Sequence, residues 1–304
     1  MNRKIEITLS IFGYHAHTKC GRAYRSLERT CPRGVGMVTG FSALLLKRVF
    51  VLFILCVGLT MFSGCGQQQK YGDNLYQVST LQALMDGMYD GQVSIGELKR
   101  QGCEGIGTVD ALDGELVVLD GGAWHIRADG KAYPLKNSDT TPFADVCSAH
   151  SVTSLNIPSG WSYEKFRELL DSKAGNMNFP LAVRVDGTFS YVKTRSVPAQ
   201  KKPYPPLTEV VKHQPVFELH NVRGTLVGFR MPEYFKGVNM PGYHLHFITA
   251  DRSEGGHVLD FTASSAAAQV GYCTNVRITL PATEDFAKAD LGRDMSAEIH
   301  KAEK

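Results

Sequence analysis

The sequence predicts an α+β protein of two halves, each built on a mixed or antiparallel β-sheet with few short helices. Three observations support this class. Apolar runs alternate with Asp-Gly and Gly-Gly turns in residues 102–135, as in an antiparallel meander. The helical patterns are few, and each is short. The segment SVPAQKKPYPPL, residues 196–207, holds four prolines and is typical of an extended connector between two halves.

Length and composition describe an ordinary globular body behind a basic N-terminal end. The chain has 304 residues, of which 43% are apolar and 21% are charged. The formal net charge of +3 comes from residues 1–48, which hold nine Lys or Arg and two Asp or Glu. The rest of the chain carries 24 basic and 28 acidic side chains, so the body lacks the basic excess that nucleic acid requires.

The first 65 residues differ from the rest of the chain. Residues 1–36 have scattered charge and no sustained hydrophobic period, so we expect a dispensable extension or a mis-assigned start codon. Residues 37–65 resemble a lipoprotein-type signal segment, because two basic residues precede the apolar run 49–62 and small residues precede Cys65. An uncleaved anchor is the alternative. Both readings predict an exported protein: a membrane-anchored lipoprotein, or a periplasmic or extracellular protein.

Residues 66–74 form the predicted linker, and residues 75–200 form the predicted N-terminal sheet sub-domain. Its first strand ends at a Ser-Thr pair that can cap a helix with an apolar stripe in residues 81–88. Ser94 can cap a second short helix, and the meander described above follows.

Further strands and one helix complete this half. Strands are predicted at Phe143–Val152 and Ala182–Val192, and Ser162 precedes a helix that runs through Leu170. Because Asp-Gly is a turn dipeptide, we also expect a tight turn between strands at Arg184–Phe189.

Residues 201–304 form the predicted C-terminal metal-binding sub-domain with a C-terminal tail. Its expected elements are strands near residues 216–219, 224–229, 267–270 and 275–280, a histidine-bearing hairpin, and a short helix at residues 283–289.

The hairpin carries the strongest chemical signal, in the stretch PGYHLHFITADRSEGGH. His244 and His246 lie two apart in an alternating apolar run, so both imidazoles leave the same face of a strand. His257 follows eleven residues later, after a glycine-containing turn. Three imidazoles that meet at one point, with an open fourth position, are typical of catalytic zinc. The spacing also fits carbonic-anhydrase-like and cupin-like sites, so it indicates a metal without indicating a reaction.

Five blocks of the sequence occur in an order that resembles the α-acetolactate decarboxylase family. They are YQVSTLQALMDGMYDG, GIGTVDALDGELVVLDG, RVDGTFSYVKTRSV, NVRGTLVGFRMPEY and GYHLHFITADRSEGGHVLDF. The resemblance runs from about residue 75 to residue 281. It implies a Zn²⁺ enzyme that converts 2-acetolactate to acetoin and CO₂ in butanediol fermentation. It also implies two sub-domains, for which we expect a barrel-like second one, and a homodimer formed through the N-terminal sheet.

The resemblance also implies the residues of the site. The three histidines would hold the zinc. Glu115 matches a family acid that reaches the metal site, and Arg195 matches the active-site arginine. A further family glutamate comes from the C-terminal tail, where Glu303 is the first candidate and Glu298 the second.

The implied chemistry suits these residue types. The metal would chelate the hydroxyl and ketone oxygens of the substrate and stabilise an enediolate as CO₂ leaves. Arg195 would bind the carboxylate or the developing oxyanion, and Glu115 or Glu303 would deliver the proton as a carboxylic acid. The alternative is a non-catalytic, exported metal-binding or ligand-binding lipoprotein. Beyond the small-molecule substrate we expect no nucleic acid partner, and membrane contact only through the N-terminal signal or lipid.

Overall fold

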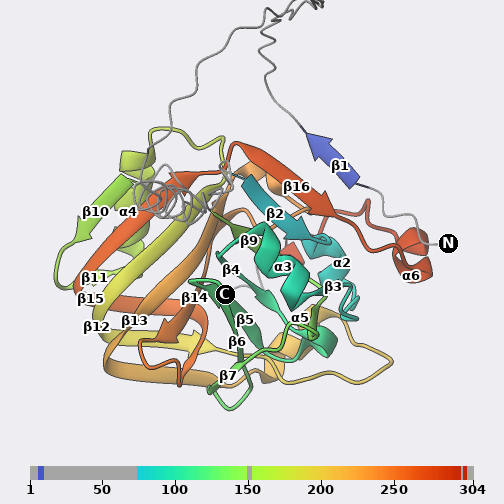
Figure 1. The fold of residues 1–304 in the computed structure, drawn as a ribbon, viewed down its shortest axis with the longest axis horizontal. Helices are drawn as coiled ribbons and strands as arrows, with labels where there is room; N and C mark the ends of the chain where they lie inside the picture. Colours follow the sequence, from blue (N-terminus) through green and yellow to red (C-terminus); the bar gives the residue numbers. More distant parts are fainter. Residues whose placement is uncertain (1–5, 10–73, 149–152, 296, 300–304) are drawn as a thin grey trace, which may run out of the picture. The chain divides into compact units, whose positions relative to one another are not determined.

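In the described part of the chain, β-strands outnumber helices and lie mainly in two large sheets (Figure 1). The structure, a computed structural model, describes residues 6–9, 74–148, 153–295 and 297–299. The predicted extension, the signal segment with Cys65 and the linker up to residue 73 lie outside these residues. In the described part of the chain, no helix is both long and apolar enough to cross a bilayer. The prediction of a mixed α+β fold with many strands and few short helices is confirmed.

The first sheet has eight strands, and the predicted meander, β4 to β7, forms one end of it. Its spatial order is β1 (Glu6–Leu9), β16 (Asn275–Thr279), β2 (Asn74–Val78), β9 (Ala144–Cys147), β4 (Glu104–Thr108), β5 (Glu115–Leu119), β6 (Gly122–Ile126) and β7 (Ala132–Pro134). β16 and β2 run parallel, and the other neighbours run antiparallel. A separate two-stranded sheet joins β3 (Val93–Ser94) and β8 (Thr140–Thr141).

The second sheet contains the longest strands and closes partly on itself. Its order is β10 (Thr153–Ile157), β15 (Gly255–Tyr272), β12 (Leu181–Arg195), β13 (Val216–Met231) and β14 (Gly242–Thr249), and β11 (Trp161–Ser162) also pairs with β15. β14 pairs with both β13 and β15, so β15, β12, β13 and β14 form a ring. This closure is the barrel-like feature that was expected.

The helices are short, and three of them begin after the predicted residues Thr80, Ser94 and Ser162. They are α2 (Leu81–Met85), α3 (Ile95–Gln101), α4 (Tyr163–Ala174), α5 (Leu207–Val210) and α6 (Glu284–Lys288), with 3₁₀ turns η1 (Asp110–Leu112), η2 (Val211–His213) and η3 (Glu233–Phe235). The side chains of Thr80, Ser94, Ser162 and Thr283 each accept a hydrogen bond from a backbone N–H in the first turn. α4 covers the end of the second sheet near β11 and β15 (Figure 1).

Two apolar clusters bear on the position of the site. Inside the second sheet, the rings of Phe247 and Phe261 meet Phe189 edge-on, with centroids 5.7 and 5.6 Å apart, and α4 adds Phe166. A second cluster joins the two sheets and includes Val117 of the first sheet. These contacts bring β5 of the first sheet against β14 of the second.

The two sheets exchange strands across residue 200. β12 precedes that position and lies in the second sheet, whereas β16 follows it and lies in the first. Each sheet therefore takes strands from both of the ranges 75–200 and 201–304. The division of the chain into these two sub-domains stays a prediction.

The tight turn expected at residues 184–189 is wrong. These residues lie inside β12, which pairs continuously with β13 and, through local irregularities, with β15. Asp186 accepts a hydrogen bond from Thr225 and pairs with Arg184 instead of shaping a turn. A Cβ on Gly187 would lie 2.5 Å from the Ser265 carbonyl oxygen, so this glycine permits close strand packing.

Candidate active site and metal centre

The three histidines of the hairpin converge on one point. His244 and His246 lie on β14, and His257 lies on β15 directly opposite His246. One ligand nitrogen from each ring lies within 4.8 Å of the other two. The ring centroids are 4.8 to 5.5 Å apart. The expected hairpin is therefore present, and its imidazoles share one small volume.

A backbone carbonyl sets the tautomer of His246. Its Nδ1 lies 2.9 Å from the carbonyl oxygen of Leu116, and a carbonyl only accepts, so Nδ1 carries the proton. Nε2 is then an unprotonated lone pair, fully buried and without a hydrogen bond among the described residues. The Glu115 Oε2 atom lies 3.4 Å from this nitrogen. The Nε2 lone pair of His246 and the Glu115 carboxyl oxygen are both electron-rich and lie close together in a buried site. Such a site favours a bound cation.

All three imidazoles are held in the neutral form. Burial lowers the pKa of His244 to about 3, and the positive charge of Arg195 adds to this effect. Burial also lowers the pKa of His246 well below its ordinary value, with His244 as the next cause. For His257, burial and then Arg195 hold the pKa well below the ordinary value. Because metals bind the unprotonated ring, the site is ready for a cation at neutral pH.

Two of the predicted polar residues reach the histidines from other strands. Glu115 begins β5 of the first sheet and is 9% exposed. Arg195 ends β12, lies opposite His257 of the neighbouring strand β15, and is 4% exposed. The first sheet, β12 and the hairpin thus each supply part of one site.

These groups line a cavity of about 50 Å³. Glu115, Arg195, His244 and His257 form much of its polar wall. Leucines, valines and a phenylalanine, several of them from α2 and α5, form the apolar part of its wall. The cavity has room for a few water molecules or the reacting part of a small substrate.

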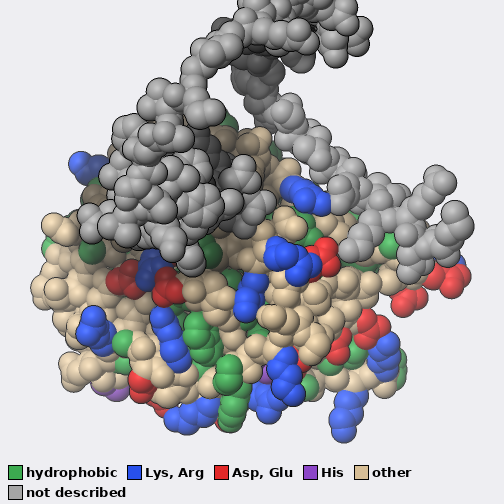
Figure 2. Space-filling model, viewed as in Figure 1, with side chains coloured by type: hydrophobic (Ala, Val, Ile, Leu, Met, Phe, Trp, Pro, Cys, Tyr) green, Lys and Arg blue, Asp and Glu red, His purple; other side chains and the backbone are tan. Residues whose placement is uncertain are grey.

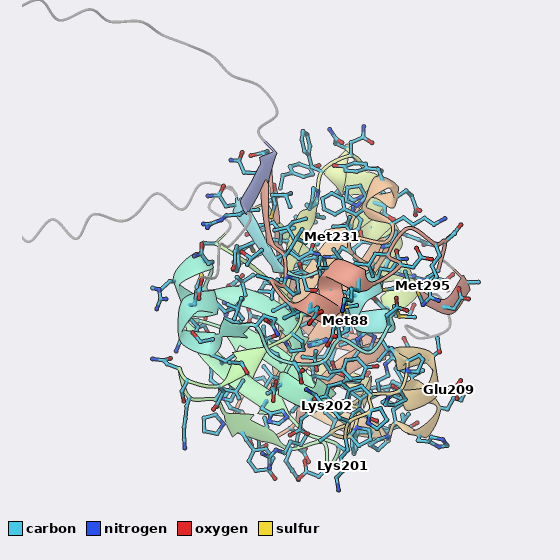
Figure 3. The ribbon with its side chains drawn as sticks, turned by 90° about the vertical axis from the view of Figure 1, so that its right-hand side faces the viewer. Met88, Lys201, Lys202, Glu209, Met231 and Met295 are labelled. Atoms are coloured by element: carbon cyan, nitrogen blue, oxygen red, sulfur yellow. The ribbon has the colours of Figure 1, made fainter. Side chains whose placement is uncertain are left out.

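The two candidate glutamates of the C-terminal tail are not among the described residues that line the cavity. Glu303 lies outside the described residues, and Glu298 is exposed and is not among the residues that line the cavity. Met295 and Ile299 are buried in a cluster that also contains the cavity-lining residues Leu81 and Leu207. Figure 3 shows Met295 on the same side of the molecule as Glu209 of α5.

Sequence reasoning missed several residues that shape the site. Thr108 and Gln214 add polar groups to the cavity wall. A Cβ on Gly228 would lie 2.1 Å from the His244 carbonyl oxygen, and one on Gly256 would lie 2.6 Å from that of Arg195. No local pattern reveals these residues, because each matters through a neighbour that is distant in sequence.

The visible surface of the molecule carries charges of both signs. On the face in Figure 2, basic and acidic side chains are interspersed, without a continuous basic patch.

Comparison with known proteins gives one consistent family. A family model described as alpha-acetolactate decarboxylase matches residues 75–293. The curated alpha-acetolactate decarboxylase of Methanosarcina mazei is 48% identical over 232 residues, which cover 76% of this chain and 81% of that protein. The alpha-acetolactate decarboxylase of Methylococcus capsulatus is 42% identical, and the match covers 75% of this chain and 88% of that protein. The crystal structure of alpha-acetolactate decarboxylase from Bacillus subtilis strain 168 matches with a TM-score of 0.73 at 40% identity. The match covers 76% of this chain and 98% of that chain.

Proposed function

The chain belongs to the α-acetolactate decarboxylase family and is a carboxy-lyase, and we propose that it converts 2-acetolactate to acetoin and CO₂ in the cavity beside the three histidines. The observation that carries this proposal is the convergence of three neutral imidazoles with the buried side chains of Glu115 and Arg195. The non-catalytic alternative is not favoured, because a protein that only carries metal requires neither a buried arginine nor a buried carboxyl group beside the ion.

We propose zinc as the cofactor, held by His244, His246 and His257. Support comes from the donor set of three imidazoles and from the buried Nε2 lone pair of His246. When bound, the ion supplies Lewis acidity that draws electron density toward a substrate oxygen as the carboxyl group leaves. The Leu116 carbonyl assists metal binding, because it keeps the His246 ring oriented and its Nε2 unprotonated.

Arg195 binds and orients the substrate carboxylate. Its guanidinium can donate two parallel hydrogen bonds to a carboxylate, and its burial strengthens that attraction. Residues 194–196 are buried too, so the backbone that carries the guanidinium is held in place. The carboxylate is therefore presented in one orientation, which lowers the entropic part of the barrier.

Glu115 supplies the proton that replaces CO₂. When the C1–C2 bond breaks, its electron pair stays with the remaining fragment, and C2 must gain a proton to give acetoin. The Glu115 carboxyl group lies beside the histidines and lines the cavity, so it reaches the reacting atoms. Glu303 is the second candidate, and the family resemblance supports it.

The proposal is tested on the purified chain by measuring bound metal, CO₂ release and acetoin from 2-acetolactate. We expect about one metal ion per chain and catalytic formation of acetoin. His246→Ala should lose both, whereas the matched variant His220→Ala, on the exposed part of β13, should keep both. Acetoin formed at the normal rate by metal-free His246→Ala protein would refute the metal assignment. Bound metal without acetoin in the unmodified chain would support the non-catalytic alternative.

We also propose export with a lipid on Cys65, and a homodimer. The basic pair, apolar run and small residues before Cys65 support the first proposal, and the family resemblance supports the second. Labelling cells with a radioactive fatty acid should mark the unmodified chain but not Cys65→Ala. Light scattering on the purified protein should give twice the chain mass, and a monomeric mass would exclude the dimer.

A further inference from the structure

Gln214 places a buried acceptor in the cavity wall. It lies between η2 and β13 and lines the same cavity as Glu115 and Arg195. Its Oε1 atom is buried and makes no hydrogen bond to any residue that the structure describes. The other newly found polar wall residue, Thr108, already donates its hydroxyl to the Gly114 carbonyl at 2.7 Å.

The segment that carries Gln214 is held in place. The Gln214 backbone N–H donates to the Val211 carbonyl at 3.5 Å, and the Ser196 N–H donates to the Pro215 carbonyl at 3.3 Å. The second bond ties the segment to the residue that follows Arg195. The backbone that carries Gln214 is thus fixed beside the backbone that carries Arg195.

A buried carbonyl oxygen without a donor destabilises a protein, and such atoms are rare in folded chains. An acceptor of this kind in a substrate cavity is explained if the substrate supplies the donor. At neutral pH the carboxylate and the ketone of 2-acetolactate only accept hydrogen bonds. Its tertiary hydroxyl group is the one donor on the molecule.

We propose that Gln214 is a specificity-determining residue, whose Oε1 accepts a hydrogen bond from the substrate hydroxyl group. This inference rests on the proposed function. The negative end of the amide dipole also repels a carboxylate, so the substrate turns its carboxylate toward Arg195 and its hydroxyl toward Gln214. The site therefore selects 2-hydroxy-3-oxo acids over 3-oxo acids that lack the hydroxyl group, because those leave Oε1 unpaired.

The test compares 2-acetolactate with 2,2-dimethyl-3-oxobutanoate, in which a methyl group replaces the hydroxyl. The second compound is measured as a competitive inhibitor of acetoin formation. Gln214→Met keeps the side-chain volume and removes the amide, and Gln92→Met is the exposed matched control. We expect Gln214→Met to lower kcat/KM for 2-acetolactate about 10- to 100-fold and to lower Ki for the dimethyl compound. The Tm should stay unchanged or rise, and Gln92→Met should change neither constant.

Each other result has a definite meaning. An unchanged kcat/KM in Gln214→Met would overturn the inference while leaving the decarboxylase function intact. Equal weakening of both compounds, together with a lower Tm, would assign Gln214 a structural role and would also overturn it. Gln214→Leu is measured in parallel, and unfolding of both variants would have the same consequence. If the unmodified chain makes no acetoin, the proposed function fails first and this inference falls with it.

Discussion

Asp145 is a carboxyl group buried between the two sheets, and its ionisation should make stability depend on pH. It lies on β9 and is 1% exposed. The Asn239 side-chain amide donates to its Oδ2 at 2.8 Å and to the Gln77 side chain at 2.9 Å. Its Oδ1 is buried without a hydrogen bond among the described residues. Burial raises the pKa of Asp145 from 3.8 to about 7, although the Asn239 bond opposes the shift.

The size of the effect follows from that shift. A carboxyl group whose pKa is higher in the folded state stabilises the fold below its unfolded pKa, and this stability is lost as the pH rises through the folded pKa. The difference between 3.8 and about 7 corresponds to about 4 kcal/mol in the free energy of unfolding. Asp145→Asn cannot ionise, so it should resemble the wild type near pH 4 and exceed it in stability at pH 8. For a domain of this size, the Tm difference at pH 8 should be roughly 8–16 °C.

Thermal unfolding followed by circular dichroism at pH 4, 6 and 8 measures this difference. Asp260→Asn changes an exposed aspartate on β15 and serves as the matched control. Comparing variants at each pH removes the titration of all other groups, which the proteins share. A Tm difference between Asp145→Asn and the wild type that is the same at all three pH values would refute the reasoning. It would mean that burial does not raise the free energy of the ionised Asp145 side chain in the folded protein.

Two further predictions concern the site. Glu115→Gln should keep its metal content and Tm but lose about 10²–10⁴-fold in kcat, because an amide cannot deliver the proton; undiminished turnover would remove Glu115 from that role. Gly228→Ala should weaken metal binding and lower the Tm, because its Cβ would lie 2.1 Å from the His244 carbonyl oxygen and push β13 away from β14. A metal titration that matches the wild type would show that this close approach is not required.

Local patterns predicted the features whose causes are local. The helix caps at Thr80 and Ser94 were predictable because a hydroxyl group bonds to an N–H three residues away. The same local logic failed at Asp186-Gly187, a dipeptide that favours turns on its own. There, β13 and β15 pair with both sides of β12, and this pairing outweighs the local preference.

The sequence by itself determined the histidine cluster. Alternation along a strand puts His244 and His246 on one face, and a short turn returns His257 opposite His246. The tertiary structure decided everything around it. It brought Glu115 from the first sheet, Arg195 from β12 and Gln214 from the segment before β13. It also supplied the burial that keeps the imidazoles neutral. The physical reason is that residues in one hairpin meet through chain geometry, whereas residues far apart in sequence meet only where sheets pair and pack.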